Sequence, residues 1–197
     1  MKILAVDVGT GTQDILLLDT RLDVENAYKM VLPAPTMIVY RRIQQATRAM
    51  RPVLLTGVTM GGGPCAWAAE AHIRAGLPLY ATPAAARTFN DDLDAVRDSG
   101  IQVISEDEAA GLPDSVQKLE LKDFDFTAIH RAMESFGLPL NDLAAVAVAV
   151  FDHGAAPQGI SDRKFRFDYL DQRIRAENKL SAFTYLKGAV PPLMTRL

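Results

Sequence analysis

Acidic and small residues near the start of the chain have the spacing of a phosphate and metal site. Asp7 ends one hydrophobic run, and the segment 9–12 separates it from a second run at 15–18. This pattern predicts a β-hairpin whose tip, residues 9–12, brings backbone N–H groups close to an anion. A buried carboxylate needs a partner, and Mg²⁺ takes carboxylate oxygens, so we predict Asp7 as a metal ligand. An ordinary hairpin turn is the alternative. The predicted phosphate ligands are Gly9, Thr10, Gly11 and Thr12.

A glycine-rich segment at 56–64 is the second candidate site. It lies between a predicted strand at 53–59 and a predicted helix that begins at Cys65. Successive glycines let the backbone turn tightly, and a helix start favours an anion or a polar ligand. The segment lacks the Lys-Ser/Thr ending of a P-loop. A tight strand-to-helix connection would explain the same residues, so both interpretations stay open. The residues placed beside the substrate are Gly61, Gly62 and Gly63.

Asp152 and His153 directly follow the most apolar run of the chain, 143–150. That run predicts a strand buried on both faces. An acid at the end of a strand can act as a general base or orient water, so we predict Asp152 as catalytic and His153 on the substrate side. The alternative is a solvated loop in which Asp152 caps a turn. The cations of segment 161–166 are an alternative site for an anionic substrate, but the pattern favours a solvated charged face.

Cys65 is the only cysteine, so the sequence offers neither an intramolecular disulfide nor a thiolate cluster. A cysteine at a helix start can have a lowered pKa, but no histidine is near it in the sequence, and we interpret Cys65 as structural. His72 and His130 lie in helical patterns typical of surface or satisfied core residues. Trp67 is expected in the core.

Strands alternate with helices along the chain, which predicts an α/β domain. The domain is expected to span 1–151, with a weakly patterned insertion at about 81–123, and 152–197 is expected to be a linking segment. The expected strands lie at 3–7, 14–20, 27–32, 53–59, 77–80, 101–104, 116–121 and 143–150. The expected helices lie at 36–50, 65–75, 91–99, 125–136 and 167–180. The first three strands should form an antiparallel meander.

Composition is that of an ordinary folded protein. The 197 residues are 49% hydrophobic and 23% charged, with a net charge of −3, which argues against broad nucleic-acid binding. The longest apolar run, 143–151, is too short to span a bilayer, and no signal-peptide pattern begins the chain. We therefore expect a cytoplasmic protein without a membrane partner.

The hairpin tip, the strand–glycine loop–helix and the acid that ends a later strand together resemble the actin, sugar-kinase and heat-shock-chaperone ATPase superfamily. The resemblance implies a ribonuclease H-like mixed sheet with flanking helices, as in the first lobe of an actin-like ATPase. It also implies ATP and Mg²⁺ as cofactors. Asp7 matches the residue that helps to bind Mg²⁺, and Gly9, Thr10 and Thr12 match the phosphate-binding turn. Asp152 lies where the catalytic or water-positioning residue is found, and segment 57–63 corresponds to one beside the sugar pocket.

Within that superfamily the chain is most similar to an uncharacterised prokaryotic family labelled pyruvate formate-lyase activating enzyme-like. The segments 7–14, 56–64 and 152–167 carry this resemblance. The activase chemistry itself is not expected, because a radical-forming activase needs three cysteines around an iron–sulfur cluster. The second phosphate hairpin and the adenosine motif of the superfamily are not found after Asp152. We therefore expect the first lobe only, with weak nucleotide binding.

Three functions remain open at this point. The first is an ATP-dependent phosphotransferase or ATPase that acts on a small-molecule or protein substrate. The second is a ribonuclease H-like nuclease, in which Asp7 and Asp152 would supply two of the acids that hold metals. The third is a non-catalytic protein that binds a nucleotide or a partner. The sequence does not indicate an oligomeric state.

Overall fold

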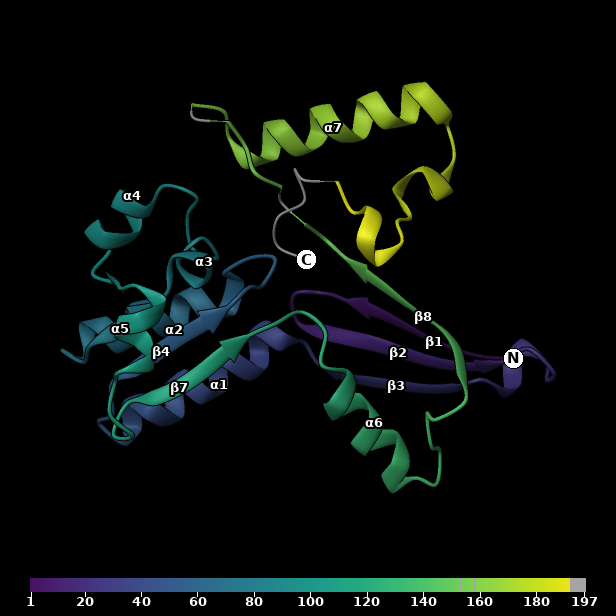
Figure 1. The fold of residues 1–197 in the computed structure, drawn as a ribbon, viewed down its shortest axis with the longest axis horizontal. Helices are drawn as coiled ribbons and strands as arrows, with labels where there is room; N and C mark the ends of the chain where they lie inside the picture. The colour runs from purple at the N-terminus through teal and green to yellow at the C-terminus, as the bar shows by residue number, and fades with distance from the viewer. Residues whose placement is uncertain (153, 158, 192–197) are drawn as a thin grey trace. The chain divides into compact units, whose positions relative to one another are not determined.

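The computed structural model describes residues 1–152, 154–157 and 159–191, and the chain divides into two compact units, Met1–Phe151 and Asp152–Leu197. The strands of the first unit are β1 (Lys2–Val8), β2 (Thr12–Asp19), β3 (Tyr28–Pro33), β4 (Val53–Gly57), β5 (Leu79–Ala81), β6 (Gln102–Val103), β7 (Gln117–Leu121) and β8 (Leu143–Val150) (Figure 1). Its helices are α1 (Pro35–Arg48), α2 (Gly63–Arg74), α3 (Pro83–Ala86), α4 (Leu93–Asp98), α5 (Glu106–Ala110), α6 (Phe126–Ser135) and the 3₁₀ helix η1 (Val24–Asn26). The second unit contains α7 (Asp162–Glu177) and the 3₁₀ helices η2 (Leu180–Phe183) and η3 (Lys187–Ala189).

The strands of the first unit form two four-stranded sheets. Sheet A has the order β3-β2-β1-β8, in which β1 pairs antiparallel with β2 and parallel with β8. Its first three strands form the predicted antiparallel meander. Sheet B has the order β6-β5-β4-β7 and is parallel. The predicted mixed α/β architecture is confirmed, and the strands of segment 81–123 pair into a second sheet that the sequence did not predict.

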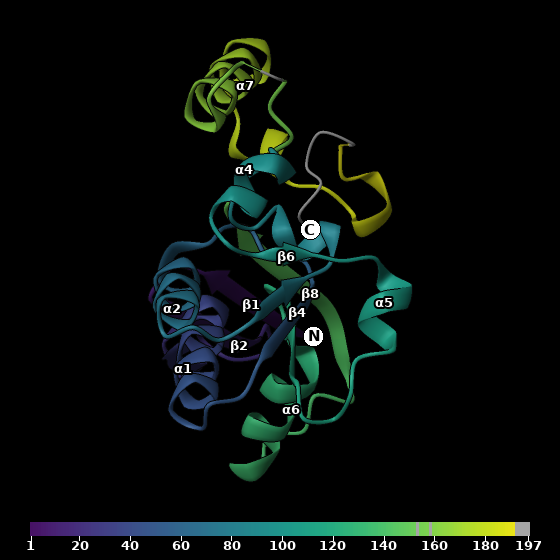
Figure 2. The ribbon, with the colours of Figure 1, turned by 90° about the vertical axis from the view of Figure 1, so that its left-hand side faces the viewer.

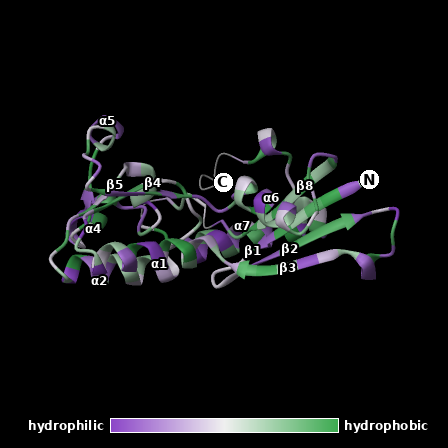
Figure 3. Cartoon of the chain, turned by 90° about the horizontal axis from the view of Figure 1, so that it is seen from below, coloured by the Kyte–Doolittle hydropathy of each residue, from purple (hydrophilic) through white to green (hydrophobic). Residues whose placement is uncertain are grey.

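The core of sheet A follows the two-residue period of its strands. Leu4, Val6 and Val8 of β1 are buried on one face, and Ile15 and Leu17 of β2 lie on the same face. Helix α6 adds buried residues to this cluster. Hydrophobic residues are prominent along these strands in Figure 3. This packing anchors the two strands that carry the hairpin tip.

Helices α1 and α2 pack against each other and against sheet B, and Figure 2 shows them side by side. Strand β4 contributes Val53 and Leu55 to this core, both fully buried, as expected for a central strand of a parallel sheet. Helix α1 begins with Pro35, whose missing N–H costs nothing in a first turn. Because α2 packs against α1 and sheet B, this core also determines where the first turn of α2 lies.

Strand β8 has the predicted position but not the predicted burial. It is an edge strand with β1 as its one neighbour in sheet A, and the six residues Ala144–Ala149 are exposed. The prediction that it is buried on both faces is wrong. Its apolar sequence is typical of a central strand, but no second strand covers its outer edge within the described residues.

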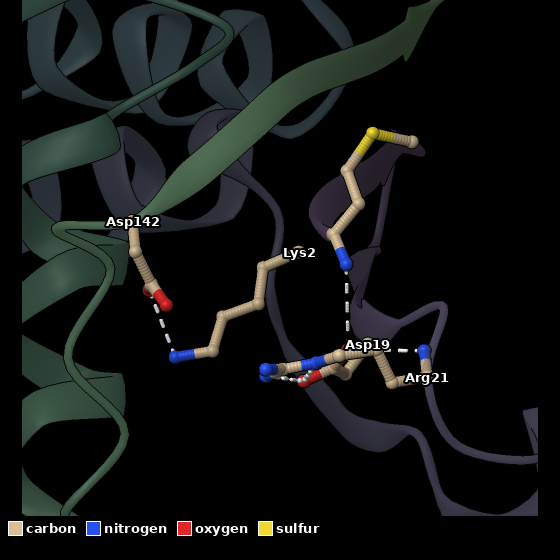
Figure 4. A network of polar contacts seen from close by, with 5 residues as sticks. Lys2, Asp19, Arg21 and Asp142 are labelled. Atoms are coloured by element: carbon tan, nitrogen blue, oxygen red, sulfur yellow. Dashed lines mark hydrogen bonds and ion pairs between the residues drawn. The ribbon is translucent and has the colours of Figure 1, made fainter.

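Ion pairs lie at the end of the hairpin opposite its tip, where β1 begins and β2 ends, and just before β8 (Figure 4). Lys2 Nζ lies 2.8 Å from Asp142 Oδ1, which joins the first residue of β1 to the residue before β8. The Arg21 guanidinium donates to both oxygens of Asp19 and holds the pKa of that carboxyl well below its usual range. Arg21 and Asp142 are exposed, whereas Lys2 and Asp19 are partly buried. Pairs with an exposed partner favour the strand register more than they stabilise the fold.

Helix α7 begins five residues earlier than predicted. Ser161 is its N-cap and accepts a hydrogen bond from the Lys164 N–H, so most of the charged segment 161–166 belongs to the first turn of the helix. No residue of α7 is buried, and pairs such as Lys164–Asp168 lie one turn apart along it. The predicted solvated charged face is therefore present, and it lies on a helix.

His72 is a buried hydrogen-bonding residue of α2. Its Nδ1 lies 2.8 Å from Thr47 Oγ1 of α1, and its Nε2 lies 3.2 Å from the Pro78 carbonyl, which can only accept. Nε2 therefore donates to Pro78, and the neutral ring accepts at Nδ1 from the Thr47 hydroxyl, whose single proton is shared with the Ile43 carbonyl 2.9 Å from Thr47 Oγ1. Burial lowers the pKa of His72, in part offset by the bond to Pro78. The prediction of a satisfied core histidine is confirmed for His72.

We expect the free energy of unfolding to fall as the pH is lowered through the unfolded-state pKa of histidine, about 6.5. The folded state resists protonation of His72, so the unfolded state binds more protons and the stability rises with pH. The measurement is the urea midpoint at about pH 7.5 and about pH 5.5, a window above the carboxylate titrations. His72→Asn should reduce the difference between the two midpoints. An unchanged difference in His72→Asn would contradict the assignment.

Candidate phosphate-binding site

The carbonyl groups of the hairpin tip are turned inward and hydrogen-bonded. Thr36 Oγ1, in the first turn of α1, donates to the Thr10 carbonyl over 2.9 Å, and the Ala34 N–H donates to the Gly11 carbonyl over 3.1 Å. The N–H and C=O groups of a trans peptide point in opposite directions, so the N–H groups of Gly11 and Thr12 point away from α1. All four tip residues are exposed. The tip thus presents donors to its surroundings, as an anion site requires.

The two glycines of the tip differ in the space around them. A Cβ added at Gly9 would lie 2.9 Å from the Thr12 carbonyl oxygen, which accepts the Gly9 N–H and closes the turn. A Cβ added at Gly11 would meet nothing within 4 Å. Gly9 is therefore required by the turn itself, whereas the space beside Gly11 is open to a ligand.

The start of α2 lies against the hairpin tip. A Cβ added at Gly63 would lie 3.2 Å from Thr10 Cγ2, so a larger residue there would crowd the tip. Gly62, the N-cap of α2, offers no side-chain cap to the first turn of this 12-residue helix. The helix start therefore brings its positive dipole end close to the donors of the tip. The structure thus joins two candidate segments that are far apart in the sequence.

The glycine-rich segment also has a packing role. A Cβ at Gly62 would lie 3.1 Å from Ala66 Cβ and 3.3 Å from the Thr88 carbonyl oxygen. Gly61 is partly buried in the turn that leads from β4 to α2. The interpretation as a tight strand-to-helix connection is therefore supported, and it is compatible with a ligand at the exposed side of Gly63.

Cys65, in the first turn of α2, is fully buried, and burial raises the pKa of its thiol to about 12. The effect of burial is larger than that of the helix dipole, so Cys65 carries a neutral thiol at physiological pH. This supports the structural interpretation of Cys65. A buried neutral thiol is also a poor ligand for an iron–sulfur cluster.

Asp7 is exposed, so the expectation of a buried, partnered carboxylate is wrong. The residue alternates with Val6 and Val8 on β1 and therefore lies on the opposite face of sheet A from the core. Asp14 of β2 is its direct partner in the antiparallel register and is also exposed. Like charges directly opposite on neighbouring strands destabilise a sheet. A bound cation would relieve this repulsion, and the pair supplies oxygen donors of the type that Mg²⁺ takes.

Asp123 is a buried acid that the sequence analysis did not single out. It follows β7, and its Oδ1 accepts from the Thr59 hydroxyl over 2.5 Å while its Oδ2 accepts from the Met60 N–H over 2.8 Å. These bonds hold the segment between β4 and the glycines. The sequence contained a signal for it, because Asp123 follows the predicted strand at 116–121 as Asp152 follows the run at 143–150.

Asp152 is the first residue of the second unit and lies two residues after the end of β8. Its Oδ1 accepts from the Gly154 N–H over 2.6 Å, and Gly154 has a φ of +70°, so the carboxylate caps a turn as one interpretation of the sequence expected. The catalytic role stays a prediction. His153 lies outside the described residues.

Trp67 is not a core residue. It lies on α2 one turn after Gly63, on an exposed face, and 65% of its surface is accessible. The prediction of a core tryptophan is wrong, because the buried face of α2 is formed by small residues such as Ala68 and Ala69. It is the only tryptophan in the chain, so its fluorescence reports on the start of α2.

No helix among the described residues is both long and apolar enough to cross a membrane. No group of three or more His, Cys, Asp or Glu side chains in that part of the chain is arranged to hold a metal ion.

The two sheets, the flanking helices and the hairpin define a mixed α/β protein that is compatible with a ribonuclease H-like or actin-like fold. The chain belongs to the family described as "Putative pyruvate format-lyase activating enzyme (DUF1786)", whose sequence profile matches residues 60–197. The matched range includes the glycines before α2, Asp123 and Asp152, and it begins after the hairpin. No curated protein matches the chain.

Proposed function

We propose that the hairpin tip and the start of α2 bind the phosphate groups of a nucleotide, and that the protein is an ATP-dependent phosphotransferase or ATPase. The inward-turned carbonyls of Thr10 and Gly11 carry this proposal, because they leave outward-facing N–H groups next to a helix N-terminus. Backbone donors and a helix dipole directed at one place favour a phosphate over a neutral ligand.

Asp7 is the proposed Mg²⁺ ligand, and Asp14 is the second carboxylate available to it. A divalent ion at this pair would neutralise charge on the nucleotide phosphates. Phosphoryl transfer depends mostly on positioning and charge stabilisation, which the tip and α2 would provide. Asp152 is proposed as the base that accepts the proton of the attacking hydroxyl or water. The family's activating-enzyme description does not supply a substrate.

The binding test is a titration of Trp67 fluorescence with Mg·ATP, and with tripolyphosphate as a phosphate-only ligand. We expect both to change the emission, with weak affinity. Gly11→Ala should weaken binding about tenfold by occupying the space in front of the tip donors, without changing the thermal midpoint. Asp7→Ala should weaken binding of Mg·ATP and remove its dependence on Mg²⁺.

The controls match each variant. Gly188→Ala also adds a methyl group in open space, and Asp23→Ala removes an exposed carboxylate beyond the other end of β2. Both should bind as the unchanged protein does. Equal affinities for Gly11→Ala, Asp7→Ala and their controls would refute the site. Phosphate release from Mg·ATP then separates the activities: binding with no release would favour a non-catalytic protein, and release lost in Asp152→Asn with binding retained would support the phosphotransferase or ATPase.

A further inference from the structure

Among the described residues, no strand pairs with the outer edge of β8, which leaves a hydrogen-bonding edge of sheet A unpaired. The strand is paired with β1 on one side, as Figure 1 shows, and Ala144–Ala149 are exposed. All eight residues of Leu143–Val150 are uncharged and apolar. A long apolar edge with unpaired N–H and C=O groups is a template for another strand.

The other sheet edges of the first unit carry features that discourage pairing. Edge strand β3 contains Lys29 and Pro33, and edge strand β7 contains Lys118 and Glu120. Edge strand β6 has two residues, too few to pair stably with a further strand on its outer side. Lysine, proline and short length are the usual protections of an edge. Among the edge strands that the structure describes, β8 is the one that lacks all of them.

The apolar layer of sheet A continues onto β8, where it is partly exposed. Leu4 and Val6 are buried, and their register partners are Val146 and Val148 on the same face of the sheet. Val146 is 45% exposed and Val148 is 38% exposed. A further strand along β8 would therefore extend both the hydrogen-bonded sheet and its apolar layer.

We infer that a second copy of this chain pairs its own β8 antiparallel with β8. An uncharged edge accepts an uncharged strand best, because a strand that carries charges would have to desolvate them. Strands β1, β2, β3 and β7 each contain charged residues, and β4 has neighbours on both sides. Two β8 strands bring no charge together. Antiparallel pairing of identical strands is two-fold symmetric and closes as a dimer.

The symmetry makes a residue-level prediction. A two-fold axis perpendicular to the sheet pairs one residue with its own copy. The strands are therefore offset by one residue from full overlap: an axis at Val146 pairs residues 143–149, and an axis at Ala147 pairs residues 144–150. Side chains at the centre of the interface are then within cross-linking reach of each other.

Light scattering after size exclusion tests the dimer. The full chain should have twice its 21.5 kDa mass at about 100 µM and approach the monomer mass near 1 µM, as expected for a small interface. Val148→Lys should shift the dissociation constant upward by at least about tenfold. Val31→Lys is the matched control, because Val31 is 63% exposed on edge strand β3, and it should dimerise as the unchanged chain does.

A cross-linking experiment tests the orientation. Ala147→Cys with a short bis-maleimide should give a covalent dimer that Val148→Lys suppresses, while the unchanged chain, whose Cys65 is buried, should not react. Circular dichroism confirms that each variant is folded. A monomer at every concentration would overturn the inference, as would a dimer that Val148→Lys and Val31→Lys affect equally. A dimer weakened by Val148→Lys without the cross-link would overturn the antiparallel arrangement.

Discussion

Gly57→Ala is expected to destabilise the first unit by about 4 kcal/mol or more. Gly57 ends β4 with a φ of +75°, and an added Cβ would lie 2.3 Å from the carbonyl oxygen of Leu121. That oxygen belongs to the end of β7 and accepts the Val58 N–H over 3.0 Å. A methyl group cannot be accommodated unless β4 and β7 separate, which disrupts a ladder in the middle of the core. Urea denaturation followed by circular dichroism measures the effect.

Gly76→Ala is the matched control. Gly76 has the same φ of +75°, but an added Cβ there meets nothing within 4 Å. Its cost should be that of the left-handed backbone alone, about 1 to 2 kcal/mol. The difference between the two variants isolates the collision with Leu121. Equal losses of stability would contradict the close approach of β4 and β7, and a Gly57→Ala chain without a cooperative transition would agree with it.

The elements that sequence predicts well are those whose signals are local. Alternating hydrophobic residues and short turns place the opening meander close to its observed bounds, because both signals lie within the strands themselves. The start of α7 is the counterexample. Ser161 carried an N-cap signal three residues before Lys164, and recognising it would have begun the helix at Asp162.

Burial is harder to predict than position. The run at 143–150 has the composition of a central strand, yet β8 lies at an edge, because its apolar residues do not specify how many neighbours it has. Trp67 shows the same limit on a helix. Its size favours the core, but small alanines pack on the buried face of α2 and leave the ring outside.

The position of the hairpin tip was predictable because it depends on one segment. The turn follows from fourteen consecutive residues, whereas the exposure of Asp7 does not. The contact between the hairpin tip and Gly63 depends on how α1 and α2 pack, and a local sequence pattern carries no information about that packing. Asp123 depends on partners even farther away, since Thr59 precedes it by 64 positions.

Asp123→Ala is expected to cost about 2 to 4 kcal/mol, because the buried Thr59 hydroxyl loses its acceptor and a bond to the Met60 N–H is removed. Asp123→Asn should cost less, since an amide oxygen can replace one carboxylate oxygen but not both. Urea midpoints measure both losses. Asp125→Ala is the matched control two residues away: it removes the α6 N-cap, which accepts from the Ala128 N–H, and should cost about 1 kcal/mol.

Hydrogen exchange distinguishes a general loss of stability from a local release of the glycine segment. Because Asp123 holds the residues just before Gly61–Gly63, we expect Asp123→Ala to accelerate exchange in peptides that cover 59–66 under native conditions. Asp125→Ala should leave those peptides unchanged and accelerate the first turn of α6 instead. The same segment leads to the start of α2, so its release should also weaken the Trp67 response to tripolyphosphate. Uniform acceleration across the first unit would show that Asp123 stabilises the fold without positioning the glycines.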